Sequence, residues 1–296
     1  MNKTDTQQPL VSCIIPSYKR SDSVARAIDS VLNQSYQNIE VCVVDDNNPG
    51  DEHSLNLHSL LKKYSDDCRV RCITQASHIN GAAARNAGIK EANGEYVAFL
   101  DDDDEWMPDK IKKQMECLLE KECDAVTSLW SLNCNDKEIR KCPPYTADNL
   151  QLKVFLREVA VFTSTLLIKK ERILEFGGFD EELLRHQDLQ FLIDSLEHCK
   201  YGVIQEYLVK LHIDSDINRP NVNKLIEAKS AFFKSVESIF DKYSKRDKRR
   251  ILNAHNFEII FHALKSKKIG IALKYFFKVK PSFKSLQDLY RRYKSR

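Results

Sequence analysis

The segment YVAFLDDDD, residues 96–104, decides how the first half of this chain folds. Its first five residues are apolar, which is typical of a strand buried on both faces of a parallel sheet. Four aspartates follow directly, and carboxylates this close raise one another's pKa unless a cation or strong donors compensate. A buried strand that ends in such a cluster indicates a divalent-metal site with oxygen ligands, and the alternative is a solvated acidic turn.

Strands and helices alternate around this segment. Strands are predicted at residues 10–15, 39–44, 70–73 and 125–129. Helices with apolar faces are predicted at residues 24–32, 57–64, 82–92 and 111–119. This alternation predicts βαβ units and a largely parallel sheet with right-handed crossovers. Asn93-Gly94 predicts a left-handed cap at the end of the third helix.

Three polar clusters come directly after predicted strands, at residues 16–20, 45–48 and 101–104. Ligands of open α/β sheets bind outside the carboxyl ends of the strands, so we expect the three clusters to share one edge of the sheet. Three clusters on one edge favour a ligand site over a solvated turn.

The second half of the chain has a more mixed pattern. Strands are predicted at 161–168 and 201–212, a glycine turn at 177–180, and a helix from Gln187 onward. From about Val222 the pattern is helical, with aromatic and basic residues interleaved. The sequence therefore predicts an α/β body followed by a helical extension.

Composition narrows the class of protein. Of the 296 residues 42% are hydrophobic, which suffices for a buried core, and the absence of a run of 18 apolar residues predicts no membrane span. Residues 1–9 are polar and lack the apolar region of a secretory signal. The nine cysteines are predicted to be reduced thiols of a cytosolic protein, since none has zinc-ligand spacing with a nearby histidine.

The net charge of +3 conceals an asymmetry. Residues 241–296 hold 17 Lys and Arg against 4 Asp and Glu, which leaves a net charge of −10 on residues 1–240. A basic tail suits a polyanionic partner such as a membrane, a nucleic acid or a phosphorylated substrate, and the alternative is a solvated helical surface. Residues 269–278 mix apolar and basic side chains at helical spacing, which favours either an anionic membrane surface or a helix packed on the body with a basic outer face.

The chain has no Walker loop and no G-x-G-x-x-G motif, so a metal must neutralise any bound diphosphate. Four motifs in order resemble those of family 2 glycosyltransferases with the GT-A fold: VSCIIPSYKR (11–20), VDDN (44–47), GAAARNAG (81–88) and GEYVAFLDDDD (94–104). The resemblance covers roughly residues 9–215. It implies a Rossmann-like, largely parallel central sheet with flanking helices.

The resemblance also implies a domain organisation. The GT-A catalytic domain would span residues 1–215, with a nucleotide-binding half at about 9–130 and an acceptor half at about 131–215. Residues 216–296 would form the basic, mostly helical C-terminal region that associates with a membrane or packs on the catalytic domain.

The resemblance assigns roles in nucleotide binding. Residues of the first loop would line the nucleotide pocket: Pro16, Tyr18 and Arg20. Tyr18 would pack on uracil, unless it is a core aromatic. Asp46 would accept the imide N–H of the base; Asp45 is equally placed by chemistry, and only the resemblance prefers Asp46. Arg85 would pair with the diphosphate or steady the aspartates, and a plain structural ion pair is the alternative.

The four consecutive aspartates at 101–104, called the tetrad below, match the D-x-D element of the family. Asp101 and Asp102 would face the ribose and the metal, and Asp103 is the first choice as a direct ligand. Four consecutive aspartates leave the register open by one position, toward Asp102 or Asp104. His212 is a further candidate ligand, although a lone histidine is more often structural. Manganese or magnesium fits oxygen ligands and a diphosphate, and would stabilise the departing UDP as a Lewis acid.

The resemblance places a general base after a glycine turn and before a helix. Asp188 stands there, and would take the proton of the acceptor hydroxyl as it attacks the anomeric carbon. Many relatives have Glu-Asp at this point, whereas this chain has Gln187-Asp188. Helix capping is the alternative role for Asp188. Direct displacement with one base inverts the anomeric centre and gives a β-glycoside.

The resemblance therefore predicts an inverting, metal-dependent transfer of a sugar, with glucose first, from a UDP-sugar to GlcNAc on a polyprenyl diphosphate. The setting would be bacterial O-antigen synthesis, at the inner face of the cytoplasmic membrane and without a nucleic-acid partner. The alternatives are a UDP-Gal or UDP-GalNAc transferase with another glycan acceptor, a sugar nucleotidyltransferase, or a non-catalytic binding module that uses the basic tail.

Overall fold

The computed structural model describes residues 8–135, 137–213 and 221–279. The chain divides into two compact units, residues 1–150 with 160–217 and residues 151–159 with 218–296. The chain therefore passes from the first unit to the second at residue 151, returns at residue 160 and leaves again after residue 217. The domain boundary expected at residue 215 and the last part of the expected basic tail, 280–296, lie outside the described residues.

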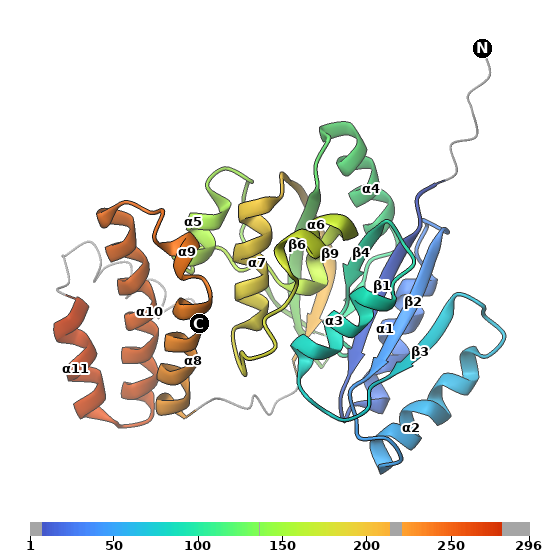
Figure 1. Ribbon diagram of the computed structural model, residues 1–296, viewed down its shortest axis with the longest axis horizontal. Coiled ribbons are helices and arrows are strands. Elements are labelled where there is room, and N and C mark those ends of the chain that lie inside the picture. The colour runs from blue at the N-terminus through green and yellow to red at the C-terminus, as the bar shows by residue number, and fades with distance from the viewer. Residues whose placement is uncertain (1–7, 136, 214–220, 280–296) are drawn as a thin grey trace. The chain divides into compact units, whose positions relative to one another are not determined.

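The first unit is built on a nine-stranded sheet (Figure 1). Its strands are β1 (Val11–Ser17), β2 (Ile39–Asp45), β3 (Val70–Thr74), β4 (Tyr96–Phe99), β5 (Glu105–Trp106), β6 (Ala125–Cys134), β7 (Lys137–Lys141), β8 (Leu167–Lys169) and β9 (Tyr201–His212). The strand order is β3-β2-β1-β4-β8-β6-β9-β5, and β7 pairs with β6. The first four strands in this order are parallel, and β8 joins them to the parallel pair β6–β9 by antiparallel pairing on both sides.

The helices of the first unit connect these strands. They are α1 (Ser21–Leu32), α2 (Glu52–Leu61), α3 (Gly81–Glu91), α4 (Lys110–Lys121), α6 (Lys170–Phe176) and α7 (Gln187–His198). The predicted α/β fold with a mostly parallel sheet is confirmed. The strand predicted at 161–168 is wrong over most of its length, because residues 163–165 form a 3₁₀ turn and β8 begins only at Leu167.

The carboxyl ends of β1, β2 and β4 meet at one edge of the sheet. Ser17, the last residue of β1, pairs with Asp45, the last residue of β2, and Ile14 of β1 pairs with Phe99 of β4. The chain runs from β1 outward through β2 to β3 and then crosses back to β4, so the strand order reverses between β1 and β4. Such a switch point is where open α/β sheets bind ligands.

Two glycines allow backbone segments to approach β1 closely. A Cβ on Gly88 of α3 would lie 2.4 Å from Cγ2 of Ile14, so α3 packs on β1 at a distance that no side chain permits. The left-handed cap predicted at Asn93-Gly94 is wrong: α3 ends at Glu91, the following residue Ala92 has extended backbone, and Gly94 does not have a positive φ. Gly94 serves instead for close approach, since its Cβ would lie 2.6 Å from the carbonyl oxygen of Leu10.

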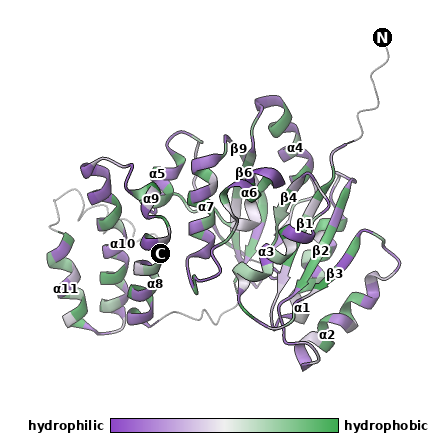
Figure 2. Ribbon diagram, viewed as in Figure 1, coloured by the Kyte–Doolittle hydropathy of each residue, from purple (hydrophilic) through white to green (hydrophobic). Residues whose placement is uncertain are grey.

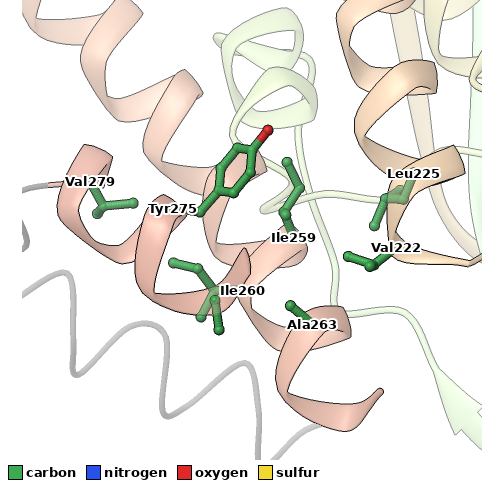
Figure 3. Close-up of a cluster of buried hydrophobic side chains, with 8 residues drawn as sticks. Val222, Leu225, Ile259, Ile260, Ala263, Tyr275 and Val279 are labelled. Carbon is green, nitrogen blue, oxygen red and sulfur yellow. The ribbon is translucent and has the colours of Figure 1, made fainter. Parts of the chain in front are cut away.

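The second unit is helical. It contains α5 (Leu150–Phe155, which begins at the last residue of the first unit), α8 (Val222–Ser235), α9 (Glu237–Phe240), α10 (Lys245–Lys265) and α11 (Ile269–Val279). A cluster of buried side chains joins α8, α10 and α11 (Figure 3): Val222, Leu225, Ile259, Ile260, Ala263, Ala272, Tyr275 and Val279. Burial of these apolar side chains is the main source of stability for three helices that would not persist alone in water.

Figure 2 shows hydrophobic residues along the central strands, whereas α10 and α11 carry hydrophobic and hydrophilic residues together. Among the described residues, no helix combines the length and the apolar character that a membrane crossing requires. All nine cysteines are free thiols.

Candidate active site

A cavity of about 460 Å³ opens at the switch point of the sheet. Its walls come from four segments, the end of β1, the residue after β2, the loop into α3 and the residues after β4. The lining residues are Pro16, Ser17, Tyr18, Arg20, Asp46, His78, Gly81, Arg85, Asp101, Asp102 and Asp103. The structure thus brings together every nucleotide-binding residue proposed from the sequence, and two of the three proposed metal ligands.

One wall of the cavity is aromatic. The rings of Tyr18 and His78 stack with their centroids 3.8 Å apart and their planes 10° from parallel. Nδ1 of His78 lies 3.0 Å from Oδ2 of Asp46 and 2.9 Å from its carbonyl oxygen. The stack therefore forms a flat surface of the kind on which a nucleobase packs, with a carboxylate at its edge.

Asp45 and Asp46 have different surroundings. Oδ1 of Asp45 accepts hydrogen bonds from the backbone and side-chain amides of Asn47, and Oδ2 accepts one from the Ser54 hydroxyl. Asp45, the last residue of β2, is fully buried and does not line the cavity, whereas Asp46 does. Burial raises the pKa of Asp46, and hydrogen bonds from the Ile79 backbone and His78 oppose this rise.

The four aspartates of the tetrad also differ from one another. Asp101 pairs with Arg85, and Asp103 pairs with Arg20. Asp102 is nearly buried, and burial, followed by the charge of Asp103, raises its pKa to about 7.

Asp104 alone of the four faces away from the cavity. It is 4% exposed and accepts hydrogen bonds from the Ser164 hydroxyl at 2.6 Å and from the His212 backbone N–H at 3.2 Å. Burial, followed by the charges of Asp101 and Asp103, raises the pKa of Asp104 well above its ordinary value.

The donor set around the cavity fits a hard divalent cation in its chemistry. Three carboxylates of the tetrad face one space. Burial raises the pKa of Asp103 as it does that of Asp102, and a bound cation would favour the ionised form of both groups. In the part of the chain that the structure describes, no three His, Cys, Asp or Glu side chains form a preorganised metal site. Arg20 and Arg85 pair with the carboxylates instead, so a cation must compete with these arginines for them.

Arg85 combines two of the predicted features. Its guanidinium donates to the Gly81 carbonyl oxygen at 3.0 Å, pairs with Asp101 and lies 5.6 Å from the ring centroid of Phe179. It also lines the cavity, beside the space that a diphosphate would need. The ion pair that the sequence left as an alternative is therefore present on the wall of the candidate site.

The remaining two predicted residues, Asp188 and His212, do not line the cavity. Asp188 is exposed in the first turn of α7. Its neighbour Gln187 adjoins the cavity wall, since Oε1 of Gln187 lies 3.6 Å from the position of a Cβ on Gly81. His212 donates its backbone N–H to Asp104, and its ring lies 3.5 Å from Glu105.

The sequence did not predict a role for His78, or the link of Ser164 to the tetrad. His78 lies in the loop of residues 75–80, which follows β3 at the same edge of the sheet as the three polar clusters. Applying the same strand-end rule there would have found it. Ser164 gave no such signal, because its link to the tetrad joins residues about 60 positions apart.

Comparisons with known proteins agree with this geometry. The family model described as "Glycosyl transferase family 2" matches residues 12–169. The amylovoran biosynthesis glycosyltransferase AmsB of Erwinia amylovora is 33% identical over 212 residues, which cover 68% of this chain and 69% of AmsB. WfgD of Escherichia coli, a UDP-Glc:alpha-D-GlcNAc-diphosphoundecaprenol beta-1,3-glucosyltransferase, is 37% identical over 110 residues, which cover 37% of this chain and 41% of WfgD.

Solved structures show the same fold. TarS 1–349 of S. aureus in complex with UDP-GlcNAc superimposes with a TM-score of 0.61 at 16% identity. The match covers 90% of this chain and 90% of that structure.

Proposed function

This chain belongs to glycosyl transferase family 2, and from that premise we propose that it moves a sugar from a UDP-sugar to a hydroxyl of a lipid-diphosphate-linked GlcNAc, with inversion. The observation that carries the proposal is the cavity at the switch point, which gathers an aromatic stack, two arginines and four carboxylates. These are the groups that a base, a diphosphate and a metal require.

The base would lie against the stack of Tyr18 and His78, with its imide N–H directed to Asp46. A carboxylate at that edge favours uracil, since cytosine has no imide N–H to donate. His78, Gln75 and the Ile79 backbone hold the Asp46 side chain in place. This fixed acceptor supports UDP as the donor nucleotide.

The diphosphate would lie between Arg85 and the tetrad. Family 2 enzymes typically depend on a divalent metal. Asp103 and Asp101 would hold Mn²⁺ or Mg²⁺, with His212 close behind the loop, and the cation would act as a Lewis acid on the leaving diphosphate. Arg20 and Arg85 would exchange their carboxylate partners for phosphate oxygens, because guanidinium groups pair well with both.

Asp188 would remove the proton from the acceptor hydroxyl. Its exposure in the first turn of α7 leaves the carboxylate open to an incoming acceptor. The loop before α7 is tied to α3, because Nδ2 of Asn80 donates to the Glu181 carbonyl oxygen and Nδ2 of Asn86 to that of Phe179. These hydrogen bonds support a role for Asp188 as the base, because they hold the loop that leads into its helix.

The lipid acceptor agrees with the surface of α11. Its buried side chains pack on α10, while Ile269, Leu273 and Phe277 are 63%, 52% and 74% exposed. Residues 259–279 contain five lysines and no Asp or Glu. An apolar face bordered by lysines suits the interface of an anionic membrane, so we place the protein at the inner face of the cytoplasmic membrane.

The direct test is a screen of UDP-glucose, UDP-galactose and UDP-GalNAc with Mn²⁺ against GlcNAc-diphosphate-lipid analogues, with the linkage of the product read by NMR. We expect a β-glycoside and free UDP, with glucose as the preferred sugar. An α-linked product would overturn the single-base mechanism. Formation of a UDP-sugar from UTP and a sugar phosphate would identify a nucleotidyltransferase instead.

Asp188→Asn tests the base. We expect this variant to bind UDP with an unchanged Kd and to lose turnover by about 10²- to 10⁴-fold, the usual range for loss of general base catalysis. Asp180→Asn is the matched control, because Asp180 is a carboxylate in the loop between α6 and α7. This variant should keep turnover. Unchanged turnover in Asp188→Asn would remove this residue as the base.

Sedimentation with vesicles tests the membrane surface. We expect binding to vesicles that contain phosphatidylglycerol, weakening as salt rises, and little binding to neutral vesicles. Phe277→Glu should weaken this binding, whereas Leu174→Glu on an exposed site of α6 should not. Vesicle binding that changes neither with salt nor in Phe277→Glu would refute the proposal that this face of α11 binds the membrane.

A further inference from the structure

The tetrad loop is held from behind by one buried hydroxyl. Ser164 is fully buried in the 3₁₀ turn Thr163–Thr165. Its Oγ accepts a hydrogen bond from the backbone N–H of Asp101 at 3.2 Å and donates one to Oδ2 of Asp104 at 2.6 Å. A single side chain thus contacts the first and the last residue of the tetrad.

Neighbouring contacts hold the backbone of Ser164 and of the tetrad loop. The indole N–H of Trp106 donates to the carbonyl oxygen of Ser164 at 2.8 Å, and the backbone N–H of Trp106 donates to the Ser30 hydroxyl at 3.2 Å. The backbone N–H of Asp104 closes a turn onto the Asp101 carbonyl oxygen at 3.0 Å. Ser164 therefore belongs to a network whose members are held on both sides of the tetrad.

We propose that Ser164 is a positioning residue for the donor site: by holding Asp104 inward, it directs Asp101, Asp102 and Asp103 into the cavity. This inference rests on the proposed function, in which the three carboxylates that face the cavity bind the metal and the diphosphate. It also excludes one of the candidate metal ligands: Asp104 accepts hydrogen bonds from Ser164 and from the His212 backbone and is not a ligand.

The physical reason is the cost of the alternatives. Four adjacent aspartates have identical side chains, so nothing in their chemistry selects which one turns inward. A buried carboxylate without hydrogen-bond donors is strongly disfavoured, and Asp104 meets two donors in its buried position, the Ser164 hydroxyl and the His212 backbone N–H. Removing the Ser164 hydroxyl removes the shorter of the two hydrogen bonds and leaves the loop free to turn another aspartate inward.

The test compares Ser164→Ala with Ser195→Ala in the full chain. Ser195 is also fully buried, and its hydroxyl contacts Tyr201 at 2.6 Å and the Leu192 carbonyl oxygen at 3.0 Å, so it is a matched control outside the site. Titration calorimetry measures the Kd of Mn²⁺ in the presence of UDP. We expect Ser164→Ala to raise this Kd about 10- to 100-fold, the usual effect of losing a group that orients ligand side chains. Ser195→Ala should lower Tm without changing the Kd.

Asp104→Asn breaks the same pair from the other side and covers the case in which Ser164→Ala does not fold. We expect it to raise the Kd in the same direction, and the double variant to bind no more weakly than the weaker single variant, because both changes remove one interaction. A Kd within twofold of the unmodified chain in the folded variants, or additive effects in the double variant, would overturn the proposal.

Hydrogen exchange separates failure of this inference from failure of the proposed function. The amides of residues 101–106 should exchange faster in Ser164→Ala than in the unmodified chain, and this needs no ligand. If the unmodified chain binds neither Mn²⁺ nor UDP, the proposed function fails whatever the exchange shows. If the unmodified chain binds both and Ser164→Ala shows neither faster exchange nor weaker binding, the inference alone fails.

Discussion

At the scale of the residue, the same side chain takes different roles according to its neighbours. Asp45 accepts hydrogen bonds from Asn47 and from Ser54 of α2, and Asp46 beside it lines the cavity. Asp104 is buried against Ser164, whereas Asp103 faces the cavity and pairs with Arg20. The donors that each carboxylate meets therefore decide whether it is held in the interior or faces the cavity.

Replacing Asp103 tests its proposed role as a metal ligand. We expect Asp103→Asn to raise the Mn²⁺ concentration for half-maximal transfer by on the order of 100-fold, because a neutral amide is a poorer ligand than a carboxylate for a hard cation. Asp124→Asn is the control, since Asp124 pairs with Arg172 away from the cavity. Full manganese-dependent transfer by Asp103→Asn would refute Asp103 as a ligand.

At the scale of the element, close packing of α3 on β1 sets the shape of the cavity. α3 carries Arg85 toward the tetrad and contacts Ile14 through Gly88. In the second unit, a buried lysine links two helices. Nζ of Lys229 on α8 lies 3.0 Å from Nδ1 of His255 and 2.9 Å from Oε2 of Glu258, both on α10. Elements in both units are therefore held by a few specific contacts in addition to apolar burial.

Gly88→Ala should destabilise the first unit by about 1–3 kcal/mol, the usual cost of overpacking a filled core. The added methyl would lie 2.4 Å from Ile14, which forces α3 or β1 to move. Gly270→Ala is the matched control in α11, where nothing lies within 4 Å, and it should be neutral or stabilise by up to about 1 kcal/mol. Chemical denaturation measures both, and equal midpoints for the two variants would contradict the close approach.

Acidification should loosen the contact between α8 and α10. Burial, followed by the charges of Lys229 and Arg157, lowers the pKa of His255 well below its ordinary value. The unfolded segment binds a proton below pH about 6.5 while the folded one does not, so stability is lost as the pH falls through and below 6.5, by up to about 1.4 kcal/mol per pH unit.

Hydrogen exchange of α10 between pH 7 and pH 5 checks this, after correction for the intrinsic exchange rate. His255→Gln removes the titrating ring, so the protection of the α10 amides against exchange should vary less with pH in this variant. His262→Gln, on the same helix but partly exposed, should keep the dependence of the unmodified chain. A pH dependence that survives His255→Gln unchanged would exclude His255 as its origin.

At the scale of the whole molecule, the second unit is assembled from two separate parts of the chain. Residues 151–159 belong to it, although both flanking segments belong to the first unit. Phe155 is fully buried there, with its ring centroid 5.5 Å from that of Tyr243, and its carbonyl oxygen lies 3.0 Å from Nε2 of His255. The two units are therefore linked by covalent continuity at three places.

A chain that ends at residue 217 should expose this segment. Phe155 would lose its aromatic partners, so we expect rapid proteolytic cleavage within 151–159 and aggregation that Phe155→Asn reduces. The full chain should resist cleavage there under the same conditions. A soluble, protease-resistant 1–217 fragment would show that residues 151–159 do not depend on the second unit.

The sequence by itself determined the family, the α/β fold and the edge of the sheet where the cavity lies. These follow from local patterns, since apolar runs define strands and the polar residues after Ile15, Val44 and Leu100 must meet once the strands are parallel. The strand-end rule therefore placed eight of the eleven cavity-lining residues in one group.

Only the tertiary structure decided which neighbouring residue does what. The stacking of His78 on Tyr18, the inward turn of Asp104 and the inclusion of residues 151–159 in the second unit each depend on partners far away along the chain. The physical reason is that adjacent aspartates have the same intrinsic chemistry. Their roles are set by which of them finds a buried donor, and Ser164 supplies that donor from about 60 residues away.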